Sequence, residues 1–355
     1  MKTKNTRENI SLIDSTLAGK SKIVETIRGI YINKTLRAGI ELELFTLLAK
    51  GALSGEEIKT HLSLHGRGLD DFLDTFVGLG ILSRDGNGKD ARYSNTEEVS
   101  LFLVKDSPQY IGDVLEYKMR EIEQYWGELP RALKTGRPQR QDIKDTGKDL
   151  FQLNYDSTQK RKRFIGGMNL GQMASFKEFI KKFDFSAYQT LCDIGGANAL
   201  FSILVALEHQ HMKLFTFDLP ALEPITREKI ADSGLSDRIT VVKGNFFENE
   251  FPKADVITMG NILHDWNLEE KKLLMGKAYD AIPPGGALVV IESLIDNQRK
   301  ENIIGLLMSL HMLLVTEGGF DFTAADFDGW AREIGFEKTV YMPLSSESNA
   351  IIAYK

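Results

Sequence analysis

The sequence predicts an α/β protein in two parts: an α-helical N-terminal part that contains a β-hairpin, and a C-terminal part built around a mostly parallel, seven-stranded sheet. Two patterns predict this division. Up to about residue 184, apolar residues recur almost throughout with the period of a helix. From Thr190 onward, seven short β-rich runs alternate with helical segments, which is typical of a doubly wound sheet. With 355 residues the chain is long enough for two domains.

The composition is that of an ordinary globular protein. The chain is 42% hydrophobic and 26% charged, with a formal net charge of −6. Nucleic-acid-binding proteins carry basic surfaces, so this acidic balance indicates no nucleic acid partner. A single cysteine, Cys192, excludes an internal disulfide and suits a reducing cytoplasm.

No targeting or membrane segment is expected. The first twenty residues lack the apolar core of a signal peptide. The longest apolar stretch, 303–315, is shorter than the roughly 20 residues that span a bilayer. We therefore expect a cytoplasmic protein that does not enter a membrane.

The N-terminal part reads as a winged-helix module. The expected elements are a helix that runs through residue 48, a helix capped by Ser54, a helix over 69–79 that ends at Gly80, and a hairpin whose strands, 81–84 and 91–94, flank the turn Asp85-Gly86-Asn87-Gly88. Winged helices also occur in DNA-binding regulators. Here the third helix, which would contact DNA, carries three acids and one basic residue over 67–75: Asp70, Asp71, Asp74 and Arg67. Phosphates repel such an acidic face, so DNA binding is not expected.

The C-terminal part alternates strands and helices. The expected strands are 190–194, 213–218, 239–243, 255–259, 287–292, 339–343 and 349–354, and the expected helices are 200–208, 222–233, 268–281, 303–315 and 324–334. In such sheets, ligands bind beside the carboxyl ends of the strands. The residues that follow the strands are therefore the first candidates for a site.

Four strand ends carry glycine, polar or aromatic residues. Gly195 and Gly196 follow the first strand and lead into a helix, where free backbone amides can bind a ligand. Asp218 ends the second strand, at the place where an acid typically accepts hydrogen bonds from ribose hydroxyls. Asn245 and Phe246 follow the third strand and offer an amide and an aromatic face to an adenine, and His264 follows the fourth. Together they indicate an adenosine-type site with a histidine beside it.

Each of these residues also has a purely structural interpretation. A tight turn uses glycine, a strand-end acid often caps a helix, and His264 stands at a helix start where it could cap. NAD is the competing ligand, but its fingerprint needs a third glycine on the helix after Gly195 and Gly196, and the sequence has none. S-adenosylmethionine (SAM), a nucleoside with an amino-acid tail, fits the pattern better.

The chain resembles the plant caffeate and acetylserotonin type of O-methyltransferase and its bacterial small-molecule relatives. The resemblance covers nearly the whole chain, and Leu263-His264-Asp265-Trp266 carries it most specifically. Pro284-Gly285-Gly286, Ile291-Glu292, Gly318-Gly319 and Gly335-Phe336 follow in the family's order. It implies a Rossmann-like class I methyltransferase domain over 185–355, a winged-helix dimerisation domain over 1–105, and linking helices over 106–184 that contribute to the substrate pocket.

The resemblance also implies roles for individual residues. Gly195 and Gly196 would contact the methionine part of SAM, Asp218 the ribose, and Asn245 with Phe246 the adenine. His264 would be the general base that removes the proton of a substrate hydroxyl, with Glu292 and Asp321 flanking and orienting it. An ordinary histidine pKa of about 6.5 would make the free base available at neutral pH.

A substrate pocket is expected around Met168, Trp266, Met308, His311 and Met312. The last three share one helical face, which could equally be part of the core. The family usually has an apolar residue at position 311, so we expect His311 to hydrogen-bond a polar substituent of the substrate. Substituting leucine there should change substrate preference and leave cofactor affinity unchanged. The acceptor is expected to be a flat, hydroxylated aromatic molecule.

Three departures from the family pattern leave an alternative open. Ala197-Asn198-Ala199 replaces part of a glycine-rich run, Asp321 is one methylene shorter than the family's glutamate, and Gly260 replaces a lysine found in plant members. Some relatives bind SAM and catalyse hydroxylation, decarboxylation or pericyclic steps, and a non-enzymatic binding protein is a further alternative. Histidine, cysteine and acidic residues show no metal-ligand spacing, so no metal is expected. A homodimer is expected.

Overall fold

The computed structural model describes residues 22–355, so the expectation about a signal peptide lies outside the described residues. The chain divides into two compact units, Met1–Arg120 and Glu121–Lys355, called here the N-terminal and C-terminal units. Each unit has its own hydrophobic core, and each is described by itself. Within the described residues, no helix combines the length and the apolar character needed to cross a membrane.

The N-terminal unit contains the predicted helices and hairpin. Its elements are α2 (Lys22–Glu41), α3 (Leu44–Leu48), β1 (Leu53–Ser54), α4 (Gly55–His61), α5 (Leu69–Gly78), β2 (Leu82–Asp85), the short 3₁₀ turn η1 (Gly88–Asp90), β3 (Arg92–Asn95) and α6 (Glu97–Phe102). Helix α7 (Gly112–Trp126) begins in this unit and ends in the next. Strands β2 and β3 pair antiparallel and β1 joins β3, which gives a three-stranded sheet. The hairpin is confirmed.

Local signals explain most boundaries in this unit. Ser54 caps α4 and exchanges hydrogen bonds with Glu57, as a capping box requires. The first helix, expected to run through Leu48, is broken instead. Glu43 has φ 56°, which ends the helical path and starts α3 in a new direction. The break turns Phe45 into the core, where its ring meets Phe76 edge-on at 5.4 Å.

The C-terminal unit begins with the linking helices and continues into the α/β fold. The linking helices are α8 (Leu129–Thr135), α9 (Gln141–Thr146), α10 (Leu150–Asn154) and α11 (Thr158–Lys182). The strands are β4 (Thr190–Ile194), β5 (Lys213–Asp218), β6 (Ile239–Lys243), β7 (Val256–Gly260), β8 (Ala287–Glu292), β9 (Lys338–Pro343) and β10 (Asn349–Tyr354). The intervening helices are α12 (Leu200–Glu208), η2 (Pro220–Leu222), α13 (Glu223–Asp232), η3 (Leu263–Asp265), α14 (Leu268–Ala281), α15 (Ile303–Val315) and α16 (Ala324–Ile334).

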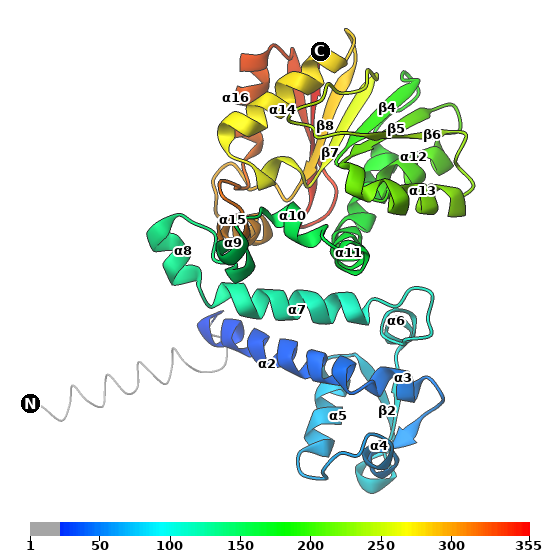
Figure 1. Ribbon diagram of the computed structural model, residues 1–355. Coiled ribbons are helices and arrows are strands. Elements are labelled where there is room, and N and C mark those ends of the chain that lie inside the picture. The colour runs from blue at the N-terminus through cyan, green and yellow to red at the C-terminus, as the bar shows by residue number, and fades with distance from the viewer. Residues whose placement is uncertain (1–21) are drawn as a thin grey trace, which may run out of the picture. The chain divides into compact units, whose positions relative to one another are not determined.

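The seven strands form one sheet in the order β6-β5-β4-β7-β8-β10-β9. The first five are parallel, and β10 pairs antiparallel with both β8 and β9, so the prediction of a mostly parallel sheet is confirmed. Alternate residues of a strand face opposite sides of the sheet. Accordingly Leu191 joins the core cluster on the side of α11 and α12, and Cys192 joins the cluster on the side of α14 and α16 (Figure 1).

Candidate active site

The turn between β4 and α12 requires glycine at two positions. Gly195 has φ +70°, and a Cβ there would collide with the side chain of Ile262. A Cβ on Gly196 would collide with the hydroxyl of Thr216 and with Asp193. The amides of both glycines donate to the carbonyl of Phe217 at the end of β5. The turn is therefore bound to the strand end that carries Asp218.

Asp218 is fixed by two backbone amides. Ala197 N–H donates to one carboxylate oxygen at 2.8 Å, and Leu219 N–H donates to the other at 2.6 Å. Burial raises the pKa of Asp218 to about 6, although both hydrogen bonds lower it. At pH 7 the side chain is a fixed carboxylate, the acceptor that a pair of ribose hydroxyls needs.

The alanines of the turn adopt the conformation that favours glycine. Ala197 has φ 46° and Ala199 has φ 62°. L-residues other than glycine visit this region at a cost of about 1–2 kcal/mol. The departure from a glycine-rich run is therefore accommodated with both alanines in the left-handed conformation.

Asn245 and Phe246 follow β6. Asn245 Oδ1 accepts the amide of Phe247 and its Nδ2 donates to Glu248, so this side chain shapes its own turn. The ring of Phe246 lies edge-on to Trp266, with centroids 5.6 Å apart. The structure thus joins the segment after β6 to the segment that carries His264.

Glu292 holds the backbone around His264. The amides of Ile262, Leu263 and His264 all donate to Glu292 Oε1, at 3.1, 3.0 and 3.4 Å. Glu292 is fully buried at the end of β8, and η3 follows β7, the neighbouring strand. Parallel neighbours end at the same edge of the sheet, which is why the acid and the histidine meet.

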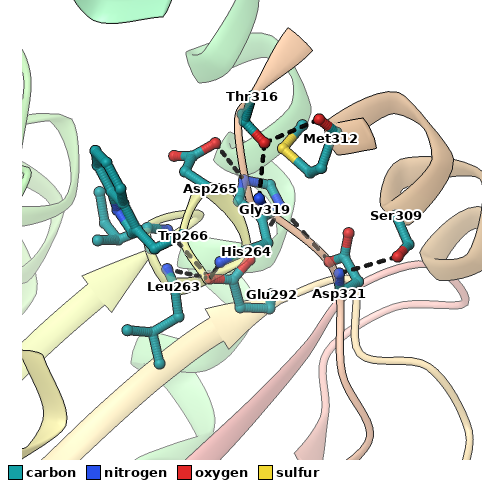
Figure 2. Close-up of polar contacts among 12 residues, drawn as sticks. Leu263, His264, Asp265, Trp266, Glu292, Ser309, Met312, Thr316, Gly319 and Asp321 are labelled. Carbon is teal, nitrogen blue, oxygen red and sulfur yellow. Dashed lines mark hydrogen bonds and ion pairs between the residues drawn. The ribbon is translucent and has the colours of Figure 1, made fainter. Parts of the chain in front are cut away.

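Three carboxylates surround the His264 imidazole (Figure 2). Nδ1 lies 3.4 Å from Glu292 Oε2 and 3.5 Å from Asp321 Oδ1, and Nε2 lies 3.6 Å from Asp265 Oδ1. One potential ligand atom of each of His264, Glu292 and Asp321 lies within 4.8 Å of the others, so these three residues could also hold a metal ion. This geometry leaves the absence of a metal as a prediction.

The electrostatic consequence differs from the ordinary histidine expected from the sequence. Burial lowers the pKa of His264, but Glu292, Asp265 and Asp321 outweigh it and raise the value to about 10. Burial also raises the pKa of Glu292 to about 7 and that of Asp265 to about 6. The imidazole is therefore a strong base that is mostly protonated at neutral pH.

Gly318 and Gly319 bring Asp321 to the histidine. A Cβ on Gly318 would crowd Asn267, and one on Gly319 would collide with the carbonyls of His264 and Asp265. The loop can approach only because both side chains are absent. The hydroxyl of Ser309 accepts the Asp321 amide at 3.2 Å and fixes the acid in place (Figure 2). The shorter aspartate therefore comes within 3.5 Å of Nδ1.

Four of the five predicted substrate residues lie in aromatic or apolar surroundings. Met308 and Met312 pack in one cluster with Trp126, and His311 stacks on that Trp126 ring at 6.5 Å. Trp266 stacks on Phe151 at 5.7 Å. The fifth residue, Met168, is half-buried on α11 and is not part of the methionine cluster.

Sequence reasoning missed three residues that the structure places at this site. Asp265, which entered only as part of a motif, lies 3.6 Å from Nε2 of His264. Tyr155 follows α10, and its phenol is buried. Burial raises the pKa of Tyr155 well above its usual value, and the nearby carboxylates of Asp218 and Asp265 raise it further. Lys271 lies on α14 and is fully buried. An aromatic residue within a helical stretch gives no signal of a site, and a lysine beside a second lysine reads as solvent-exposed.

These residues fit SAM chemically. Asp218 supplies carboxylate oxygens for hydroxyl donors, the turn at Gly195 and Gly196 opens a helix N-terminus, and Phe246 supplies an aromatic face. SAM carries ribose hydroxyls that match Asp218, an amino-acid tail that matches the glycine turn, and a flat adenine that matches Phe246. His264 lies one strand end further along the same edge of the sheet.

Comparison with known proteins identifies the family. Residues 126–337 match the family model of the O-methyltransferase domain, and residues 24–105 match that of the O-methyltransferase dimerisation domain. The tetracenomycin polyketide synthesis 8-O-methyl transferase TcmO of Streptomyces glaucescens is 30% identical over 90% of this chain and 91% of its own. The N,N-dimethyltransferase OxyT of Streptomyces rimosus is 32% identical over 74% of this chain and 75% of its own.

A solved structure agrees over almost the full length. Human N-acetylserotonin methyltransferase in complex with SAM has a TM-score of 0.82 and 27% identity, and the match covers 95% of this chain and 99% of that chain. Fold and sequence thus agree over both parts of the molecule. The chain belongs to the O-methyltransferase family, and it is a SAM-dependent enzyme.

Proposed function

We propose that this enzyme transfers the methyl group of SAM to a hydroxyl of a small, flat aromatic acceptor, with His264 as the general base. The observation that carries the proposal is the buried imidazole whose Nδ1 faces Glu292 and Asp321. Two acids on one nitrogen keep the proton there, so Nε2 is the nitrogen that can accept a proton. Histidine held in this way is the usual general base of an enzyme.

The chain's own residues prepare the acceptor oxygen. SAM, when bound, supplies an activated methyl group. His264 Nε2 takes the proton of the acceptor hydroxyl, and the carboxylates of Glu292 and Asp321 stabilise the imidazolium that results. Asp265, 3.6 Å from Nε2, lies where it can orient the same hydroxyl. In-line placement of oxygen and methyl then supplies much of the rate.

The remaining roles are part of the same proposal, and the geometry above supports them. Asp218 would hold the ribose and Gly195 with Gly196 the methionine tail, while Phe246 would cover the adenine and Asn245 would support that segment through its turn. The acceptor would contact Met168, Trp266, Met308, His311 and Met312. The aromatic rings among them, His311 on Trp126 and Trp266 on Phe151, offer flat faces of the kind that an aromatic acceptor needs.

The whole protein would work as a cytoplasmic homodimer. The match to a dimerisation domain over 24–105 supports the dimer, and the single cysteine suits the cytoplasm. The domain boundaries 1–105, 106–184 and 185–355 are part of the same proposal.

The test is transfer of a labelled methyl group from SAM to a panel of phenols, with an aryl amine included because OxyT is an N,N-dimethyltransferase. We expect a labelled phenol ether, and a loss of SAM affinity of about 10- to 100-fold in Asp218→Asn. The matched control is the exposed Asp237→Asn, which should bind SAM like the wild type. SAM bound without any methylated product would favour a non-methylating relative, and unchanged affinity in Asp218→Asn would refute the assigned ribose site.

A further inference from the structure

Lys271 is a lysine with no exposed surface, beneath the loop that carries His264. It belongs to the first turns of α14, and its relative exposure is 0%. Lysine is almost never fully buried without compensating groups, because desolvating an ammonium is costly. Neighbouring Lys272 shows the ordinary behaviour: it is partly exposed and pairs with Glu333 at the surface. The burial of Lys271 therefore calls for a specific reason.

The ammonium of Lys271 contacts two of the segments that build the site. Its Nζ donates a hydrogen bond to the carbonyl of Trp266, two residues after His264. The same Nζ lies 3.6 Å from the centre of the Phe320 ring and 5.7 Å from that of Phe322. These two phenylalanines flank Asp321 in the sequence. Lys271 thus links the segment of the histidine to the loop of its acid, through a hydrogen bond and a cation–π contact.

The charge of Lys271 also matters to the site. Among the residues that the structure describes, no carboxylate lies within ion-pair distance of its Nζ, yet Glu292, Asp321 and Asp265 all stabilise the charged form. Burial lowers the pKa of Lys271 to about 8, although these three acids and Glu270 of its own helix act to raise it. Without this cation, three buried carboxylates would face a single imidazole.

We propose that Lys271 is a positioning residue of the His264 site: it ties the histidine segment to the Asp321 loop and supplies the second positive charge that balances the three carboxylates. The proposal rests on the proposed role of His264 as base. Its effect on the base has a definite sign. Below its own pKa of about 8, the Lys271 ammonium disfavours the imidazolium and increases the free-base fraction of His264; above that pH the lysine is neutral and the effect disappears.

Two substitutions separate the charge from the hydrogen bond. Lys271→Gln removes the charge and keeps a donor for the Trp266 carbonyl, whereas Lys271→Met removes both and preserves the bulk of the side chain. Replacing a buried charge by an apolar side chain of similar volume is often neutral for stability, so the methionine variant should fold. The surface control is Lys272→Met.

The decisive readout is the titration of the His264 imidazole by NMR on histidine-labelled enzyme, with the signal assigned by its loss in His264→Gln. We expect the wild-type imidazole signal to show a step near pH 8, where Lys271 loses its charge, before its own titration near pH 10, and both Lys271 variants to lack that step. Lys272→Met should leave it unchanged. This readout needs neither SAM nor an acceptor, so it stays informative even if no methyl transfer is found.

The kinetic readout follows the same sign. In both Lys271 variants, kcat/KM should be about tenfold below the wild-type value at pH 7, because the lysine charge no longer favours the free base. The glutamine variant should approach the wild-type value above pH 8, where wild-type Lys271 is also neutral, and the methionine variant should stay lower at every pH. A merely structural lysine would lower the thermal midpoint and leave both pH curves in place. That result, the same changes in Lys272→Met, or failure of both Lys271 variants to fold, would overturn the proposal.

Discussion

The His264 imidazole has carboxylates beside both of its nitrogen atoms, and this arrangement determines the pKa of the proposed base. Glu292 and Asp321 lie beside Nδ1 and Asp265 lies beside Nε2. The three acids overcome the effect of burial, so the pKa of His264 rises to about 10. A base of this strength takes a phenolic proton readily, but only the deprotonated fraction can do so.

The rate should therefore increase with pH across the neutral range. Below the pKa of His264, the free-base fraction grows about tenfold per pH unit, and kcat/KM should follow it. The measurement is kcat/KM for a neutral phenol between pH 6 and pH 10, roughly the range between an ordinary histidine and this one. A plateau already reached at pH 7 would mean that the acids do not raise the pKa of His264 in the working enzyme.

The sequence predicted the members of this cluster and not their electrostatics. His264, Glu292 and Asp321 stand in three separate segments, and the family resemblance placed all three. Lys271 escaped prediction because a helix that reads Glu-Glu-Lys-Lys looks like a solvated face. Its burial results from packing of the Phe320 loop over it, a tertiary contact that local sequence does not encode.

At the scale of elements, the turn from β4 into α12 has alanine at two positions whose backbone conformation favours glycine. Ala197 and Ala199 have φ angles of 46° and 62°, a region that glycine adopts without steric cost. The methyl groups cost conformational energy and leave the hydrogen bond from Ala197 to Asp218 intact. The turn therefore keeps its hydrogen bond to Asp218 while the two alanines lower the stability of the protein.

Ala197→Gly should stabilise the protein. Relief of the left-handed strain, about 1–2 kcal/mol, exceeds the extra entropy of glycine in the unfolded chain, so we expect the free energy of unfolding to rise by about 0.5–1 kcal/mol. The measurement is urea unfolding followed by circular dichroism. The control is Ala174→Gly, an exposed position in the middle of α11, which should lose about 1 kcal/mol. A loss of stability in Ala197→Gly would show that the methyl group is not strained.

The strands of the sheet were predictable and one helix was not. Buried β-rich runs bounded by turn residues gave β4, β5, β6, β8 and β10 with the boundaries that the structure has. The break between α2 and α3 was missed because apolar periodicity runs through Glu43 without interruption. The chain turns there because Phe45 packs against Phe76 in the core, and this tertiary contact is not visible in the local sequence.

At the scale of the whole molecule, the N-terminal unit leaves apolar side chains of α2 uncovered. Ile27, Ile30 and Tyr31 are 49%, 60% and 67% exposed. Such a group in one helix is typical of an interface between subunits. It lies within the residues that match the O-methyltransferase dimerisation domain.

The enzyme should therefore behave as a dimer in light scattering, with twice the 39.9 kDa mass of the chain. Placing a charge in the apolar group, by Ile30→Asp or Tyr31→Asp, should shift the mass toward that of the monomer at micromolar concentration. Asn33→Asp, an exposed polar position of the same helix, should remain dimeric. A wild-type monomer would contradict the proposed assembly and leave the chemistry of the site untouched.

The central claim is that His264 performs the proton transfer and does not hold the fold or the cofactor, and the comparison of His264→Gln with the wild type tests it most directly. In one preparation, kcat is measured with a methylated phenol as product, and affinity for S-adenosylhomocysteine is measured by calorimetry. The exposed His61→Gln serves as the control. We predict that His264→Gln lowers kcat by about 10²–10⁴-fold with little change in affinity, and that His61→Gln changes neither. A His264→Gln enzyme that keeps the wild-type kcat would contradict the claim.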